Sequence, residues 1–280
     1  MRLPVRRAYH VIYDETLEDA LRYASSNDWT GIVPDIGVPT FSPDRIQSDE
    51  RGRLRDLSHD LSIEWGFHAP GDDVSLFSTY LPVREGIMRY FKQVIDFARV
   101  LSVKPTNLVI HAGNPPSFRK AGEKSDNFSS IHHDVYTQTF RKNLTELIEH
   151  GRPHVKIVLE NVNWTPLVCE VLQNLFPTGL KICLDIPKLY HPGFRLNESD
   201  WNFIQRNKGV IEVVHIHDYH PTLGDHQIVG EGVLDFERVL RFLEELPTKP
   251  QYVFEVRPRE SATQSLHNIG RLMEILNLNL

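Results

Sequence analysis

Short apolar runs alternate with helix-like segments along the whole chain, and this alternation limits the fold more than any other feature. Each apolar run has the length and composition of a buried strand. We expect strands at 7–12, 31–35, 63–68, 107–111, 156–160, 181–185, 212–217 and 252–256. Helical periodicity predicts helices at 17–25, 87–101, 136–149, 167–175, 200–206, 236–246 and 262–276.

Strands that alternate with helices in this way predict parallel βαβ units. The expected strands favour an α/β fold in which one domain, residues 1–280, forms a single closed (β/α)8 TIM barrel. No glycine-rich phosphate motif follows the first strand, which argues against a dinucleotide-binding sheet. The carboxyl ends of the strands of such a barrel meet at one mouth, so we expect the active site there. The segment 114–130 follows the fourth strand and would overhang this mouth.

The composition restricts the expected cellular location and the classes of binding partner. The 280 residues carry a formal net charge of −6, which gives no basic surface for nucleic acid. We expect no membrane span, because no apolar stretch approaches about 18 residues. Cys169 and Cys183 are too few for a disulfide framework, and the first residues lack a signal-peptide pattern. We therefore expect a cytoplasmic protein with a small-molecule substrate, and the sequence leaves open whether it forms a homo-oligomer.

Acidic or imidazole side chains stand at the ends of the last four expected strands. They are Glu160, Asp185, His215 and Glu255. One such residue alone could be a helix cap or an ion-pair partner, but several carboxylates buried together are costly without a cation. The set therefore predicts a site for a divalent metal ion. Oxygen ligands with an imidazole suit Mn²⁺, Zn²⁺, Co²⁺ or Mg²⁺, and the sequence does not choose among them.

The other histidines divide into two groups. His68 and His111 end the third and fourth expected strands, and His226 lies on the loop after the seventh. We interpret the isolated histidines as structural, surface or solvated loop residues: His10, His132, His133, His150, His220 and His267.

A series of short motifs runs from the third expected strand to the eighth. They are HAP at His68, HAG at His111, LEN at Glu160, CLD at Asp185, HIHD from His215, GEG at 230–232 followed by VLDF, and FEVR at Glu255. Together they resemble the xylose-isomerase-like superfamily of TIM barrels. That superfamily contains sugar isomerases and epimerases, inosose dehydratases and class II apurinic endonucleases.

The resemblance implies roles for these residues. In the isomerases and epimerases, the residues matching Glu160, Asp185, His215 and Glu255 bind one divalent metal ion, and those matching Glu160 and Glu255 also exchange a proton with the substrate. In the endonucleases, the residues matching His68, His111 and Glu160 bind a first zinc, and the four-residue set binds a second. A third zinc uses a histidine three residues after the aspartate, an aspartate on the loop after the seventh strand, and a histidine matching His226.

The chain departs from the endonuclease pattern at this third site. Lys188 stands where the endonucleases have histidine, and Gly224 stands where they have aspartate. Asp225 is one position away and could compensate after a loop shift. Lys188 could contact substrate oxygens or donate a proton to them, and it could equally form a salt bridge to a neighbouring carboxylate.

The leading hypothesis is a metal-dependent isomerase or epimerase of a sugar, sugar phosphate or related polyol carbonyl. Carboxylates would transfer a proton through a metal-stabilised enediolate, with Glu160, Glu255 and Lys188 as the catalytic residues. The alternative is a phosphoester hydrolase related to the class II apurinic endonucleases, with His68 and His111 at a second metal; a lyase that dehydrates a cyclic polyol is also compatible. The expected substrate contacts are His217, His226, Arg257 and Trp164.

Overall fold

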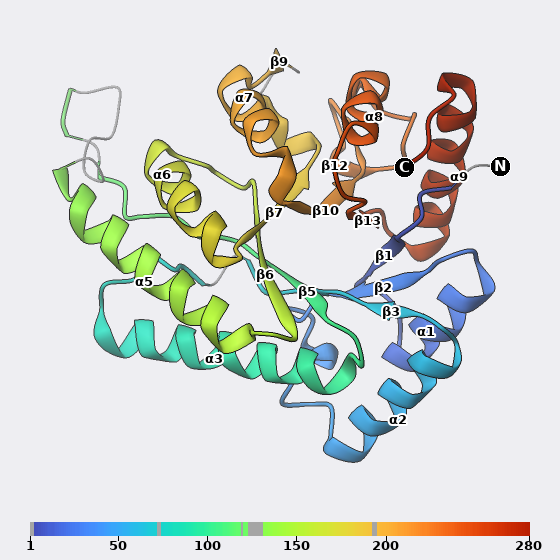
Figure 1. The fold of residues 1–280 in the computed structure, drawn as a ribbon, viewed down its shortest axis with the longest axis horizontal. Helices are drawn as coiled ribbons and strands as arrows, with labels where there is room; N and C mark the ends of the chain where they lie inside the picture. The colour runs from blue at the N-terminus through green and yellow to red at the C-terminus, as the bar shows by residue number, and fades with distance from the viewer. Residues whose placement is uncertain (1–2, 72–73, 119, 123–130, 192–194) are drawn as a thin grey trace.

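The computed structural model describes residues 3–71, 74–118, 120–122, 131–191 and 195–280. Parallel strands form a central ring, and the helices lie around its outside (Figure 1). The order of pairing around the sheet is β3-β2-β1-β13-β10-β7-β6-β5-β4. The strands are β1 (Arg7–Val11), β2 (Gly31–Pro34), β3 (Glu64–Trp65), β4 (Phe67–His68), β5 (Thr106–Ile110), β6 (Val155–Glu160), β7 (Lys181–Asp185), β10 (Ile211–Ile216) and β13 (Gln251–Phe254).

The third strand of the barrel is broken at Gly66 into β3 and β4. The first piece pairs with β2 and the second with β5, and a parallel bridge joins Asp35 to His68. A Cβ atom on residue 66 would lie 2.8 Å from the Gln251 Oε1 atom and 2.9 Å from the Val33 Cγ2 atom. Glycine therefore lets the broken strand approach the barrel interior closely, and the ring closes through it. The predicted TIM barrel is confirmed.

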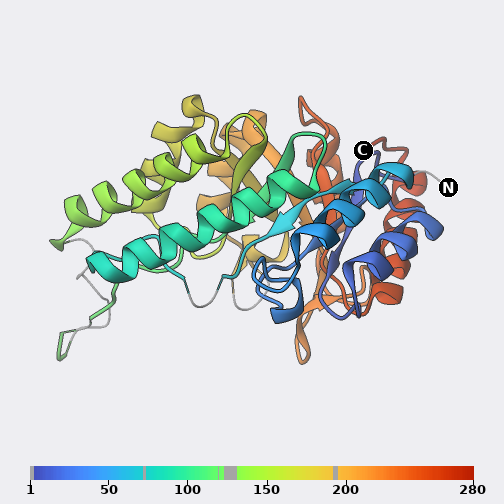
Figure 2. The same cartoon turned by 90° about the horizontal axis from the view of Figure 1, so that it is seen from below.

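An α-helix follows each strand of the barrel, as the alternating pattern predicted. In the described part of the chain these are α1 (Leu17–Ser26), α2 (Ser48–Asp60), α3 (Leu81–Leu101), α5 (His133–Gly151), α6 (Pro166–Leu175), α7 (Glu198–Arg206), α8 (Phe236–Glu244) and α9 (Arg259–Leu276). Figure 2 shows the long helices α3 and α5 side by side on one flank of the ring. Side-chain caps set several helix starts, such as Thr16, whose hydroxyl accepts a hydrogen bond from the Asp19 N–H.

Helix α2 was missing from the predicted helices, and α3 begins before its predicted start. The α2 sequence SDERGRLRDLSHD is largely charged, and only Leu54 and Ser58 are buried. Without a regular apolar face, the sequence pattern carries little helical signal. Helix α3 begins at Leu81 with Pro82 in its first turn, a position that proline suits because no helical hydrogen bond is lost there.

Two layers of apolar side chains support the barrel. Large residues such as Tyr9, Phe67 and Phe254 point outward and pack against the helices. A separate cluster of small residues fills the interior, and its members are Ala8, Val33, Val109, Val158, Cys183, Val213 and Val253. Because side chains alternate along a strand, the unbroken strands β1, β2, β5, β6, β7, β10 and β13 contribute to both layers. The inner cluster forms the floor of the mouth.

Loops at the carboxyl end carry two small hairpins. One pairs β8 (Tyr190–His191) with β9 (Arg195–Leu196), and the other pairs β11 (Asp218–His220) with β12 (Gly224–Gln227). Of the segment 114–130, expected to cover the mouth, residues 119 and 123–130 lie outside the described residues. No helix in the described ranges is both long enough and apolar enough to cross a membrane.

Candidate active site

A ring of polar side chains lies one layer above the barrel floor. Val158, Cys183 and Val213 belong to the floor, and two residues further along the same strands stand Glu160, Asp185 and His215. The same spacing holds around the barrel, because residues two apart on a strand share a face. The ring consists of His10, Asp35, His68, His111, Glu160, Asp185, His215 and Glu255, one from each strand of the barrel or the residue that follows it.

The four residues predicted to bind metal lie together and are almost wholly buried. The His215 Nδ1 atom is 3.4 Å from the Glu160 Oε2 atom and 3.4 Å from the Glu255 Oε2 atom. Asp185, His215 and Glu255 each offer a ligand atom within 4.8 Å of the other two, and so do His68, Glu160 and His215. His215 therefore lies between the two predicted proton-transfer carboxylates.

The donor set fits a divalent cation. His215 is fully buried, yet neither of its ring nitrogens has a hydrogen-bond partner among the residues that the structure describes. Buried polar atoms are normally hydrogen-bonded, so an unpartnered imidazole surrounded by carboxylates calls for a bound ion. Glu160, Asp185, His215 and Glu255 are the residues that could hold it.

Neighbouring imidazoles stabilise the charged form of the two glutamates. Burial alone would raise the pKa of Glu160, but His215, His111 and His68 bring it well below its ordinary value. Burial opposes ionisation of Glu255 too, and there His215 and His10 hold the pKa well below its ordinary value. Both side chains are thus carboxylates, the form that binds cations and accepts protons.

His68 and His111 both lie against Glu160. The Nε2 atoms of these histidines are 3.2 and 3.1 Å from the same Oε2 atom of Glu160. Burial would lower the pKa of His68, but the hydrogen bond and charge of Glu160 outweigh it and raise this pKa to about 9. The structure thus brings together the residues expected to hold a second metal.

Lys188 forms the salt bridge that the sequence left as one of two alternatives. Its Nζ atom lies 2.5 Å from the Asp225 Oδ2 atom, and its backbone N–H donates to the Asp185 Oδ1 atom at 3.1 Å. Burial would lower the pKa of Lys188, but the charges of Asp185 and Asp225 raise it. An ammonium and its counter-ion therefore lie beside Asp185.

His217 and His226 stack near Asp185 and Glu255, with their ring centroids 4.5 Å apart. The Nε2 atom of His217 is 3.2 Å from the Asp185 Oδ2 atom, while its Nδ1 atom accepts the backbone N–H of His226. Burial and the neighbouring His217 lower the pKa of His226 to about 4. Of these two expected substrate contacts, His217 is fully buried and His226 is partly open to solvent.

The remaining expected contacts lie at the edges of the site. Trp164 donates its indole N–H to the Glu160 carbonyl and packs edge-on against Phe203, which places it beneath its loop. An Arg257 Nη2 atom lies 3.3 Å from the His10 Nδ1 atom. The substrate contacts of both residues stay predictions.

Asn161 connects two strands beneath the site. Its amide donates to the Asp185 carbonyl at 3.0 Å and accepts the Asp185 N–H at 2.6 Å. The Asn161 side chain therefore binds both backbone polar groups of Asp185, as a neighbouring strand would, and fixes the position of this predicted metal ligand.

The sequence interpretation missed two members of the ring. His10, which the sequence analysis interpreted as a structural or surface residue, is buried at the mouth, with its Nδ1 atom 3.3 Å from the Glu255 Oε1 atom. Asp35 closes the second strand and faces His10 and His68. The signal that could have found them is the spacing of two residues from Ala8 and Val33, which holds on the other strands.

Comparison with known proteins places the chain in a family. A family model described as xylose isomerase-like TIM barrel matches residues 21–274. The chain belongs to this family. Among curated proteins it is similar to the uncharacterized protein MJ1311 of Methanocaldococcus jannaschii, with 25% identity over 251 residues that cover 86% of this chain and 79% of that protein.

Two solved structures share the fold of this chain at low sequence identity. L-ribulose 3-epimerase superposes with a TM-score of 0.73 and 15% identity, covering 99% of this chain and 96% of that one. Endonuclease IV from Thermus thermophilus superposes with a TM-score of 0.63 and 16% identity, covering 96% of this chain and 99% of that one. At these identities the two likenesses show a shared fold and carry no role over to this chain.

Proposed function

We propose that this protein is a metal-dependent isomerase or epimerase of a sugar, sugar phosphate or related hydroxy-carbonyl compound. The observation that carries the proposal is the pair Glu160 and Glu255, whose Oε2 atoms both lie 3.4 Å from the Nδ1 atom of His215. In the pairing order β13-β10-β7-β6, two strands separate these glutamates, so they approach one central space from different directions.

Two facing carboxylates suit a reaction that moves a proton at a carbon atom. One glutamate removes the proton next to the carbonyl, and the other returns a proton to the same carbon or its neighbour. Glu160, Asp185, His215 and Glu255 would hold a divalent cation, whose positive charge would polarise the substrate carbonyl. Lys188, neutralised by Asp225, lies beside Asp185 and adds a fixed cation and donor at the rim.

The pair of Lys188 and Asp225 also argues against apurinic endonuclease activity. By the family resemblance, Lys188 stands where those enzymes carry a third-zinc ligand. The Lys188 ammonium repels a metal ion at that position. Its ion pair with Asp225 also engages a carboxylate that could otherwise bind a metal ion. Phosphodiester cleavage is therefore the second candidate function. The contacts of His68 and His111 with Glu160 favour a two-metal version of it.

Proton exchange at carbon gives the decisive experiment. The metal-loaded protein is incubated in D₂O with a panel of ketopentoses, ketohexoses and their phosphates, and deuterium at carbon is followed by NMR. We expect exchange and a new isomer for at least one compound. Glu160→Gln, which keeps the shape but removes the base, should lower the rate by about 10²- to 10⁴-fold.

The matched control is Glu237→Gln, because Glu237 lies on the outer helix α8 and pairs with Arg241 at the surface. Its turnover should equal that of the unmodified protein. Full activity in Glu160→Gln would contradict the proposal. Cleavage of a phosphodiester without any exchange at carbon would favour the second candidate.

A further inference from the structure

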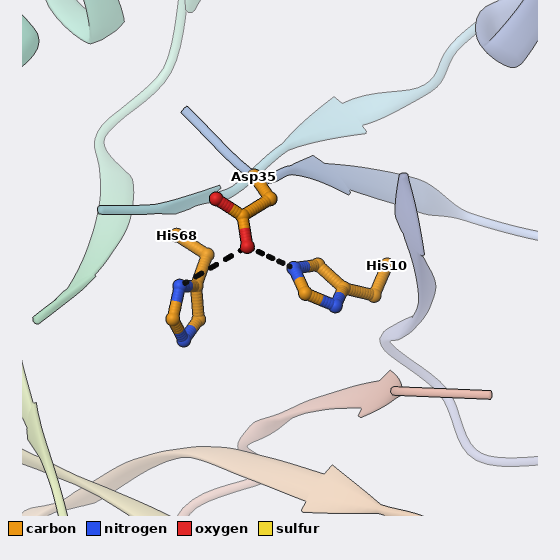
Figure 3. Close-up of side chains that lie close together, drawn as sticks. All are labelled: His10, Asp35 and His68. Atoms are coloured by element: carbon orange, nitrogen blue, oxygen red, sulfur yellow. Dashed lines mark ion pairs between the residues drawn. The ribbon is translucent and has the colours of Figure 1, made fainter. Parts of the chain in front are cut away.

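Three side chains converge at the β1–β4 side of the mouth, outside the set of Glu160, Asp185, His215 and Glu255. Figure 3 shows His10 and His68 on either side of the Asp35 carboxylate. The Asp35 Oδ2 atom is 3.6 Å from the His10 Nε2 atom and 3.9 Å from the His68 Nδ1 atom. We propose that these three residues bind a second divalent transition-metal ion of the zinc or cobalt class.

The spacing of the three ligand atoms suits such an ion. Each of the three residues offers a ligand atom within 4.8 Å of those of the other two. Two ligands bound at about 2.1 Å in tetrahedral geometry lie about 3.4 Å apart, so both distances from Asp35 need to shorten by only a few tenths of an ångström. Two imidazoles and one carboxylate select transition metals and leave coordination positions open, whereas Mg²⁺ and Ca²⁺ prefer oxygen ligands throughout.

An unpartnered nitrogen points into this cluster. The His10 ring is 2% exposed, and its Nε2 atom has no hydrogen-bond partner within the described ranges of the chain. In Figure 3 the same atom faces the Asp35 carboxylate. Because a buried polar atom is normally hydrogen-bonded or metal-bound, this nitrogen marks a ligand position.

The opposite nitrogen of each ring faces a glutamate. The His68 Nε2 atom lies 3.2 Å from the Glu160 Oε2 atom, and the His10 Nδ1 atom lies 3.3 Å from the Glu255 Oε1 atom. Metal-binding histidines commonly donate their second ring N–H to a carboxylate, which fixes the ring and directs the other nitrogen at the metal. Both histidines have this carboxylate in place.

Each ring also has a competing partner that a metal ion would displace. The His68 Nδ1 atom is 2.9 Å from the Ala69 carbonyl, and the His10 Nδ1 atom is 3.3 Å from an Arg257 Nη2 atom. A cation at the cluster selects the tautomers that carry the proton on His68 Nε2 and His10 Nδ1, where the glutamates accept. His68 then cannot also bind a metal through Nε2 together with His111. The proposed site and a site at His68 and His111 therefore exclude each other.

Asp35 leaves the cluster open toward the mouth. Its side chain is 21% exposed, while those of His10 and His68 are at most 8% exposed. The Asp35 Oδ1 atom accepts the Gly37 N–H at 2.7 Å, which holds the carboxylate and leaves Oδ2 for a metal. The open positions of a bound ion would thus face the space where substrate enters.

Metal counting tests the proposal. Chelator-treated full-length protein is titrated with Co²⁺, and bound equivalents are measured by visible absorption and by elemental analysis. We expect two equivalents in the unmodified protein and one fewer in Asp35→Asn and in His10→Asn. In Asp35→Asn the amide oxygen can still accept the Gly37 N–H, so the turn is preserved. The matched control, His111→Asn, should bind as many equivalents as the unmodified protein.

Circular dichroism and thermal melting establish that each variant is folded. A single equivalent in the unmodified protein would overturn the proposal. So would an unchanged count in Asp35→Asn, or loss of the second equivalent in His111→Asn with retention in Asp35→Asn. The readout is metal content rather than turnover, so this proposal and the proposed function fail independently.

Discussion

The two sides of the barrel mouth hold their polar residues at different depths. On the β6–β13 side, the side chains of Glu160, Asp185, His215 and Glu255 are at most 5% exposed. On the β1–β4 side, Asp35 is 21% exposed and faces two buried histidines. A bound cation stabilises the buried side more strongly, because the carboxylates there are removed from water. On the β1–β4 side, the Asp35 carboxylate remains partly accessible to solvent.

The largest expected effect is on the buried side. Glu255→Gln keeps the size of the side chain but removes the carboxylate that faces Glu160 across His215. We expect turnover of the sugar substrate to fall by about 10²- to 10⁴-fold with the fold retained. Steady-state kinetics and circular dichroism check this, and a fall of less than threefold would remove Glu255 from the proton-transfer role.

We expect a smaller effect from a change at Asn161, whose side chain holds the backbone of Asp185. Asn161→Ala removes both hydrogen bonds to the Asp185 backbone. Loss of such a support typically weakens metal binding by about 10- to 100-fold. Calorimetric titration of the metal-free protein measures the affinity at the tighter site. As a control, Asn268→Ala removes a hydrogen bond on helix α9, to the Val229 carbonyl, and should leave this affinity unchanged.

The closure of the β1–β4 side depends on Gly66. An added Cβ would meet Gln251 and Val33 at less than 3 Å, so Gly66→Ala should destabilise the fold by about 1–3 kcal/mol, as overpacking does. Thermal melting should show a lower Tm.

Gly86→Ala is the control, and its expected effect on stability has the opposite sign. Gly86 lies in α3 with open space around it, so alanine there should stabilise the helix by up to about 1 kcal/mol. Equal melting points for the two variants would contradict the description of this closure.

The smallest effect is expected at the rim. Lys188 and Asp225 are both about a third exposed, so their salt bridge is screened by solvent. Asp225→Asn should change the free energy of unfolding by no more than about 1 kcal/mol, measured by urea denaturation. A loss of several kcal/mol would show that the pair supports the barrel rather than the site.

Sequence patterns predicted the buried side of the mouth far better than the open side. In the barrel strands β6, β7, β10 and β13, an apolar run leads to a carboxylate or an imidazole at or next to the strand end, and the family motifs cover the same residues. His10 and Asp35 lie outside those motifs, and the sequence signal for them is the weaker one of their spacing of two residues from Ala8 and Val33. Helix α2 escaped prediction for a different reason, since its charged sequence lacks an apolar stripe. The pairing of Lys188 with Asp225 depends on the path of the β11–β12 hairpin, which spacing alone does not fix.

Anomalous diffraction from crystals of the zinc-loaded protein would locate the bound metal ions. We expect a strong peak among Glu160, Asp185, His215 and Glu255, and a second peak between Asp35 and the facing nitrogens of His10 and His68. A map without a peak at the first position would contradict the metal-dependent reaction proposed for this protein.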